Sequence, residues 1–210
     1  ATCNIGATVP EGYGDYYAWG ETETYYEYAD VETGGGFRWK EGKGGRYGWE
    51  SYFDIETITP TEYEDEVTFK KYKTLDKILI DPEDDAAHVI WGGNWRMPTK
   101  AELDELADSK NCAWTWTTIN GVKGYKVTSK IPGYEGNYIF LPAAGLYTWE
   151  VDHLIYPGSE GRYWSASIYN RYSDESTVCA YSFYLKNVDP KISVTSGARC
   201  FGFSIRPVCP

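Results

Sequence analysis

The chain has 210 residues, enough for one domain with a sizeable core, whereas two domains would both be small. Its 20 Lys and Arg residues face 31 Asp and Glu residues, and the net charge of −11 is spread along the chain. This charge excludes a typical nucleic-acid or anionic-lipid binder, since the densest basic segment, 69–73, directly follows an acidic one, 62–66. No segment approaches the roughly 18 apolar residues of a membrane span, so we expect that this chain does not insert into a membrane.

The cysteines and the first residues leave the cellular compartment open. Residues 1–10 have neither the charged nor the apolar region of a signal peptide. One or two disulfides would fit an extracytoplasmic protein, but free buried thiols fit equally well, and an odd cysteine number leaves one thiol unpaired. No C-x-x-C pair exists and only two histidines are present, so we expect no metal site of the zinc type. The cysteines are Cys3, Cys112, Cys179, Cys200 and Cys209.

The segment 11–60 is the least regular part of the chain, being rich in Gly, Tyr, Trp and Glu without a sustained helical or strand period. A structureless segment of this length is unusual in a compact domain, and its aromatic content argues against disorder. We therefore expect long aromatic-rich loops over 11–80, held to the core by Trp19, Trp39 and Trp49. A flexible linker is the alternative interpretation.

The first of two predicted short helices lies in 81–93, DPEDDAAHVIWGG. Asp81 can cap it, Pro82 suits the first helical position, and the two glycines that close the segment end it. His88 lies on this helix, with no second ligand at a spacing that would hold a metal. We therefore interpret His88 as a packed or solvated side chain.

The second predicted helix lies in 97–110, MPTKAELDELADSK. Thr99 and Glu102 have the spacing of a capping box, in which each side chain binds a backbone N–H group of the other's turn. Leu103 and Leu106 follow on one face of the helix, which predicts that this face packs against the core.

After residue 112 the sequence favours short strands separated by turn residues. In the last of these runs Phe201, Phe203 and Ile205 alternate with small or polar residues, the pattern of a half-buried strand. Two helices followed by a strand-rich half predict an α+β fold with a mainly antiparallel sheet and long loops. The predicted strands are 124–129, 137–142, 162–167, 178–185, 191–195 and 200–208.

The tract 163–187 has an unusual composition, because five Tyr, five Ser and two Asn residues make up nearly half of it. Cores prefer aliphatic residues and Phe, and disordered segments avoid aromatic residues. Tyr, Ser and Asn together are typical of antibody combining sites, where Tyr supplies contact area and Ser and Asn supply adaptable hydrogen bonds. The composition therefore indicates a binding surface, although an ordinary edge strand with one wet face is the alternative.

The segment 91–106, WGGNWRMPTKAELDEL, resembles the major-paralogous-domain proteins first noted in Fibrobacter and abundant in gut Bacteroidetes. GYKVTSK, IFLPAAG, YWSAS and GFSIRPV follow in the family's order, and GDYYAWGETE and ATCNIGA look like its upstream blocks. The resemblance covers nearly the whole chain and is weakest over 24–80. It implies a C-type lectin-like fold, in the branch shared with formylglycine-generating enzymes and with receptors diversified by retroelements.

The resemblance also implies roles for individual residues. In this fold the first and last strands lie side by side, which would bring Cys3 near Cys209 and makes them the favoured disulfide. The tract 163–187 corresponds to the face that diversified receptors vary. We therefore expect a single domain over 1–210, with 163–208 forming the binding face and the closing strands. The implied framework positions are Trp91, Trp95, Pro98, Leu141, Pro142, Gly145, Trp164 and Arg206.

Together these features predict a non-enzymatic ligand-recognition module at the bacterial cell surface, anchored by a segment outside this chain, that binds a protein or a glycan. In the second half of the tract, alternation directs Tyr181, Phe183 and Leu185 toward the core and the intervening side chains toward solvent. The preceding loop adds residues of the kind that bind ligands. The expected ligand-binding residues, forming one solvent-facing patch, are Ser167, Tyr169, Asn170, Arg171, Tyr172, Ser182, Tyr184 and Lys186.

No catalytic residue and no cofactor are expected, because two isolated histidines offer no nucleophile paired with a base and no nucleotide-binding motif is present. An enzyme of the formylglycine-generating type is an alternative from fold kinship, but 199–207 lacks the cysteine pair of that class. A purely structural surface domain is the other alternative. The EPN, QPD and WND tripeptides of calcium-dependent lectins are absent, and we interpret the acidic runs 63–66 and 83–85 as solvated.

Overall fold

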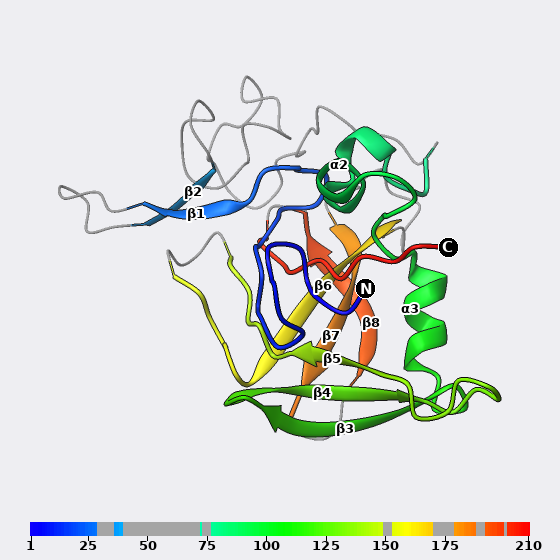
Figure 1. The fold of residues 1–210 in the computed structure, drawn as a ribbon. Coiled ribbons are helices and arrows are strands. Elements are labelled where there is room, and N and C mark those ends of the chain that lie inside the picture. Colours follow the sequence, from blue (N-terminus) through cyan, green and yellow to red (C-terminus); the bar gives the residue numbers. More distant parts are fainter. Residues whose placement is uncertain are drawn as a thin grey trace.

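The computed structural model of the chain describes residues 1–28, 36–39, 72, 77–148, 153–169, 179–187, 192–199 and 201–210 (Figure 1). Outside this description lie Asn170, Arg171, Tyr172, Trp49, Cys200, the acidic segment 62–66 and the side chain of Trp39. The elements are β1 (Tyr25–Tyr28), β2 (Gly36–Trp39), the 3-10 helix η2 (Pro82–Asp84), α2 (Ala86–Trp91), α3 (Lys100–Ala107), β3 (Cys112–Ile119), β4 (Val122–Ser129), β5 (Tyr138–Pro142), β6 (Glu160–Ile168), β7 (Cys179–Lys186) and β8 (Ser193–Ala198).

The strands form three antiparallel sheets within the described residues, with the orders β1-β2, β3-β4-β5 and β6-β7-β8. Figure 1 shows β3, β4 and β5 along one end of the molecule, with β6, β7 and β8 rising from them and α3 at their side. Two α-helices and two three-stranded antiparallel sheets agree with the predicted α+β class.

Two regions contain more regular structure than the sequence indicated. The hairpin β1-β2 lies in the segment expected to form loops, and β3, CAWTWTTI, was not among the predicted strands. The start of the same loop region lies in the core, because Tyr17 forms a bridge with Phe203 and is 2% exposed. Trp19 is fully buried, as expected, and its indole N–H donates to the carbonyl oxygen of Ser165 at 2.7 Å.

The first predicted helix starts later than expected. Pro82 begins a single 3-10 turn, and Asp81 makes no capping hydrogen bond. Asp85 is the N-cap of α2, since its Oδ1 accepts from the backbone N–H groups of Ala87 and His88 at 2.9 and 3.3 Å. Its Oδ2 also accepts from Met97 N at 2.8 Å, so one buried carboxylate joins the helix start to the segment that precedes α3.

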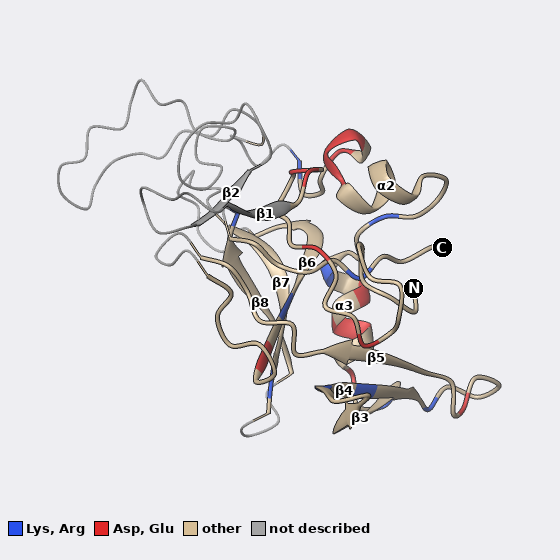
Figure 2. Ribbon diagram, turned by 60° about the vertical axis from the view of Figure 1, so that its left-hand side comes forward, with Lys and Arg blue, Asp and Glu red and all other residues tan. Residues whose placement is uncertain are grey.

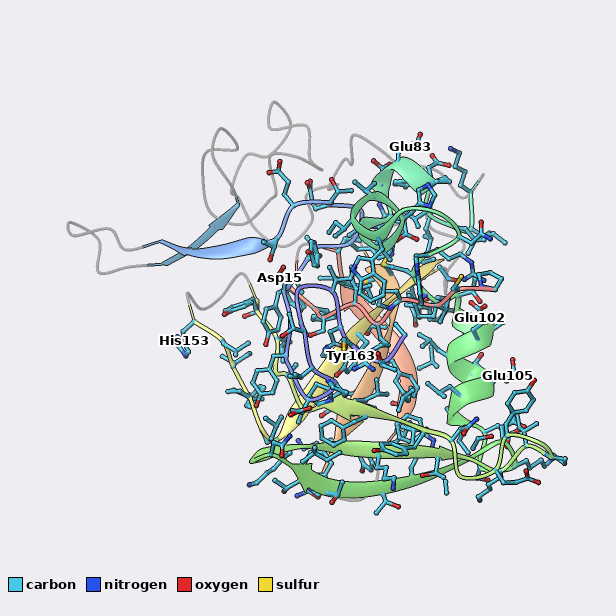
Figure 3. The ribbon with its side chains drawn as sticks, in the orientation of Figure 1. Asp15, Glu83, Glu102, Glu105, His153 and Tyr163 are labelled. Atoms are coloured by element: carbon cyan, nitrogen blue, oxygen red, sulfur yellow. The ribbon has the colours of Figure 1, made fainter. Side chains whose placement is uncertain are left out.

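The capping box predicted for the second helix is confirmed. Thr99 Oγ1 accepts from the N–H group of Glu102 at 3.3 Å, and Glu102 Oε2 accepts from Thr99 N at 2.8 Å. Arg96 adds two hydrogen bonds to the Glu102 carboxylate, at 2.7 and 2.8 Å. Leu103 is buried, and Leu106 packs beside it against the sheets, as predicted. Figure 3 shows Glu102 and Glu105 on α3 at the side of the molecule.

We expect Glu102→Gln to reduce the decline in the free energy of unfolding that occurs as the pH becomes acidic. The hydrogen bonds from Arg96, followed by those from Thr99, lower the pKa of Glu102 from 4.5 to about 2. A carboxyl group with a lowered folded-state pKa stabilises the fold above pH 4.5 and loses that contribution as the pH falls toward 2. The variant should lose about 1 kcal/mol at pH 7 and show a shallower decline between these pH values, measured by urea unfolding. Parallel pH profiles for the two proteins would contradict this.

The sheet β6-β7-β8 is packed on both faces. On one face Tyr163, Phe183 and Leu185 join a core cluster that includes Leu103 of α3. On the other face Trp164 joins a second cluster with residues from the N-terminal, α2 and C-terminal segments. Tyr163, labelled near the centre of Figure 3, donates its hydroxyl to the carbonyl oxygen of Pro142 at 2.6 Å.

The C-terminal run 201–208 is not a half-buried strand, which corrects the expectation from alternation. Residues on both of its sides are buried from Gly202 to Pro207. It makes isolated bridges instead, with Phe203 pairing with Tyr17 and Ser204 pairing with Tyr163 of β6. The alternating small and polar residues face a second layer of protein rather than water.

The two ends of the chain lie side by side, as Figures 1 and 2 show. Ile5 N donates to the carbonyl oxygen of Ile205 at 3.1 Å. The amino group of Ala1 donates to the carbonyl oxygen of Pro207 at 2.8 Å. Cys3 and Cys209 nevertheless are both free thiols, so the favoured disulfide is not formed in this structure. Adjacent termini agree with the expectation drawn from the resemblance, whereas the bridge does not.

A candidate ligand-binding face on β6, β7 and β8

Strand register arranges side chains of β6, β7 and β8 in rows on one face of the sheet. Glu160 pairs with Lys186 in the first row, and Arg162 pairs with Tyr184 in the second. Tyr184 in turn pairs with Ser193 of β8. Because side chains alternate between faces, these five residues lie on the same face. We call them the polar face: Glu160, Arg162, Tyr184, Lys186 and Ser193.

The remaining rows of the same face are covered by the core. Trp164 pairs with Ser182 in the third row, and its ring stacks on that of Phe203 with centroids 4.1 Å apart. Farther along, a β-carbon added to Gly197 would lie 2.5 Å from the Phe203 ring, so only glycine allows this close packing. The polar face lies outside this cluster, with Glu160 9% exposed and the other four residues half-buried.

Two residues expected on the solvent-facing patch are buried instead. Ser182 is 0% exposed, because it lies beside Trp164 in the covered third row. Ser167 is 9% exposed, and its hydroxyl accepts from the N–H group of Lys100, the first residue of α3. Alternation distinguishes the two faces of a strand correctly, but it cannot reveal that both faces are packed.

Tyr169 lies apart from the polar face. Its ring packs edge to face on Tyr181, with centroids 5.0 Å apart, and Lys100 Nζ lies 5.3 Å from the Tyr181 ring. Tyr181 shares a strand face with Phe183, opposite Tyr184. The five described members of the expected patch therefore do not form one surface, and only Tyr184 and Lys186 lie together on the polar face.

An ion pair and a stacked guanidinium organise the polar face. Lys186 Nζ lies 2.8 Å from Glu160 Oε1, and this interaction raises the pKa of Lys186. The Arg162 guanidinium lies over the Tyr184 ring, 4.0 Å from its centroid. Burial, followed by the charge of Glu160, raises the pKa of Tyr184. In Figure 2 the charged positions of β6 and β7 lie in the lower part of the sheet.

Sequence reasoning missed Glu160, Arg162 and Ser193 as members of this face. Arg162 lies just outside the tract that its composition singled out, and Ser193 follows it on β8. The signal that could have found Arg162 is its position two residues before Trp164, on the same strand face. Cross-strand pairing brings these residues together, and the sequence of a single strand does not predict which residues it will pair with.

The histidines and the acidic run 83–85 do not form a second candidate site. His88 Nδ1 lies 3.3 Å from the carbonyl oxygen of Trp95, and Figure 3 shows His153 at the far edge of the molecule from α3. The expectation that 83–85 is solvated is wrong for Asp84 and Asp85, which are buried, and Asp84 accepts from the Tyr72 hydroxyl at 2.7 Å. No group of three metal-ligating side chains occurs within these described segments.

Cys112 and Cys179 lack the setting of an activated nucleophile. Burial raises the pKa of the thiols of Cys112 and Cys179, which disfavours the reactive thiolate. Both are buried or half-buried in the sheets. A thiol chemistry of the formylglycine-generating kind therefore finds no support at these two positions.

A cavity of about 160 Å³ lies on the opposite side of the sheet, between α3, β5 and the C-terminal segment. Leu103, Ile139 and Phe183 contribute to its mostly apolar lining. The charged groups beside it, Glu102 and Arg206, are bound by other parts of the protein. Unlike the polar face, this cavity presents no available polar side chain.

Comparison of the chain with protein-family models, with curated proteins and with solved structures found no match in any of the three. Among the helices that the structure describes, none has the length and apolar character needed to cross a membrane. Inferences about function therefore depend on the polar face and on the sequence.

Proposed function

We propose that the chain is a non-enzymatic recognition module that binds a protein or glycan ligand through the polar face. The supporting observation is a group of half-buried Arg, Lys, Tyr and Ser side chains that lie outside the two core clusters packed on the faces of the sheet. Tyr and Arg are the residues most often found to dominate binding energy at protein surfaces.

The rigidity of this surface favours binding. The Lys186–Glu160 ion pair and the stacking of Arg162 on Tyr184 restrict four side chains before any ligand arrives. Side chains that are already ordered lose less conformational entropy on binding, so more of the contact energy contributes to affinity. The packed sheet beneath holds their backbone positions.

The resemblance to major-paralogous-domain proteins supports a further part of the proposal, namely a C-type lectin-like domain displayed at the bacterial cell surface. The gene sequence upstream of Ala1 tests the display, because a start codon with no export signal would contradict it. Diversification by a retroelement is tested by the DNA around codons 160–208. A nearby near-copy that differs mainly at adenines is the expected sign of it.

We expect Tyr184→Ala to abolish most ligand binding. Wild-type protein would be applied to an array of defined glycans and to an array of extracellular proteins, and the variant compared on each ligand found. Loss of a dominant aromatic side chain should weaken binding by at least about tenfold. Tyr134→Ala is the matched control, because Tyr134 is 64% exposed on a loop outside the polar face.

The purely structural alternative predicts a different result. If no ligand is found on either array, or if both tyrosine variants bind as the wild type does, the polar face is not a binding site. Thermal unfolding of both variants shows whether a loss of binding reflects a loss of fold. Lys186→Met, which keeps the aliphatic stem and removes the charge, provides a second change within the polar face.

A further inference from the structure

Arg162 has no hydrogen-bonding or ion-pair partner among the described residues. Its contacts there are with aromatic rings, at 4.0 Å from the Tyr184 centroid and 5.9 Å from that of Phe203. Its Nε is buried and makes no hydrogen bond. Glu160, two residues earlier on the same face, is already paired with Lys186. The guanidinium is thus positioned by stacking, and its side-chain N–H groups make no hydrogen bond with the described residues.

Two other arginines have guanidinium groups that are held by hydrogen bonds within the protein. Arg96 makes a two-pronged pair with the carboxylate of Glu102 at 2.7 and 2.8 Å. Arg206 donates to four acceptors, among them Asn4 and Phe140. Both guanidinium groups are hydrogen-bonded within the protein, whereas that of Arg162 makes no hydrogen bond with the described residues.

A half-buried guanidinium without an acceptor is energetically unfavourable. Burial lowers the pKa of Arg162, which reflects the cost of removing its charge from water. The Ser182 hydroxyl, in the adjacent row of the same face, is likewise buried without a hydrogen-bond partner. A ligand that supplies an acceptor beside Arg162 would remove part of this cost, and a carboxylate matches the guanidinium fork best.

The dimensions of the polar face limit what the ligand can be. Three strands about 4.8 Å apart and two rows about 7 Å apart give an area of roughly 10 by 7 Å. A stable protein interface buries about 800 Å² per partner, far more than this area offers. A mono- or disaccharide fits it, and the chain's charge of −11 disfavours a polyanion over a ligand with a single carboxylate.

We propose that Arg162 binds the carboxylate of an acidic saccharide, with Ser193 and the Lys186–Glu160 ion pair beside it on the same face. This inference rests on the proposed binding role of the polar face. It assigns the ligand class and names Arg162, rather than Tyr184, as the residue that selects for the acid. Tyr184 holds the guanidinium in position by stacking.

The test uses sugars that differ only at one carbon. D-glucuronate and D-galacturonate carry a carboxylate where D-glucose and D-galactose carry a hydroxymethyl group. Titrations followed by NMR should show that the uronates bind at least about tenfold tighter than the neutral sugars and shift the Arg162 Nε–H resonance. Arg162→Met should remove this preference, whereas Arg162→Lys should retain part of it because the charge remains but the fork is lost.

Three outcomes would overturn the inference. Equal affinities for uronates and neutral sugars, or an unchanged uronate preference in Arg162→Met, would each exclude Arg162 as a carboxylate anchor, and no binding of any uronate would exclude the acidic saccharide. If a Glu-containing peptide binds and the uronates do not, the carboxylate comes from a protein and the saccharide assignment is wrong. A ligand that is lost in Tyr184→Ala but retained in Arg162→Met would leave the proposed function standing without this inference.

Discussion

Replacing Trp164 with alanine is expected to lower the free energy of unfolding by about 3–5 kcal/mol. Trp164 is 0% exposed and stacks on Phe203, so its removal would leave a cavity between the sheet and the C-terminal segment. Its indole N–H also donates to the carbonyl oxygen of Tyr17 at 2.6 Å, and that buried acceptor would lose its partner. Urea denaturation of the two proteins measures the difference.

Trp164→Phe separates the two contributions. The phenyl ring keeps much of the stacking with Phe203 but cannot donate to Tyr17, so we expect a loss of about 1–3 kcal/mol. A loss below about 1 kcal/mol for Trp164→Ala would show that this cluster does not hold the sheet and the C-terminal segment together. The polar face borders this packing, because the Arg162 guanidinium lies 5.9 Å from the centroid of the Phe203 ring.

Arg206→Met is expected to destabilise the protein by about 3 kcal/mol or more. Arg206 is 6% exposed, and its guanidinium donates to Asn4 Oδ1 at 2.8 Å and to the carbonyl oxygens of Thr2 and Phe140, both at 2.8 Å. Each buried acceptor left without a donor costs about 1–3 kcal/mol. Because these acceptors belong to the N-terminal segment and to β5, the variant should also loosen the adjacent chain ends, which hydrogen exchange at Ile5 would report.

Arg206→Lys is the matched control for this prediction. An ammonium group keeps the charge but cannot reach acceptors on separate segments in the way that a planar fork does. We expect it to recover only part of the lost stability. Full recovery would mean that charge alone matters at this position, and an unaffected Arg206→Met would show that the hydrogen bonds contribute nothing net.

Local signals in the sequence located most of the elements. The capping box of Thr99 and Glu102 identified α3 because both partners lie within one turn and need no distant contact. The Asp-rich start of the first helix was found, but the cap was misplaced from Asp85 to Asp81, since several nearby acidic residues compete for the role. β3 was missed although Trp114 and Trp116 alternate with threonine on it.

The candidate site was only partly predictable. Composition pointed to the tract that contains Tyr184, and alternation distinguished the two faces of β7. Neither indicated that Trp164 and Phe203 cover Ser182, because that burial depends on a segment twenty residues farther along the chain. Arg162 was overlooked for the same reason, since its lack of an acceptor is a property of its three-dimensional surroundings.

The sequence by itself determined the α+β class and the position of α3, because these follow from local periodicity and capping. Only the tertiary structure decided which rows of the β6-β7-β8 sheet the core clusters cover and which residues share the polar face. Antiparallel register places Arg162 of β6 beside Tyr184 of β7, and two core clusters cover the rest of the sheet. Strand pairing and layer packing join residues distant in the sequence, so no single segment carries the information that locates the polar face.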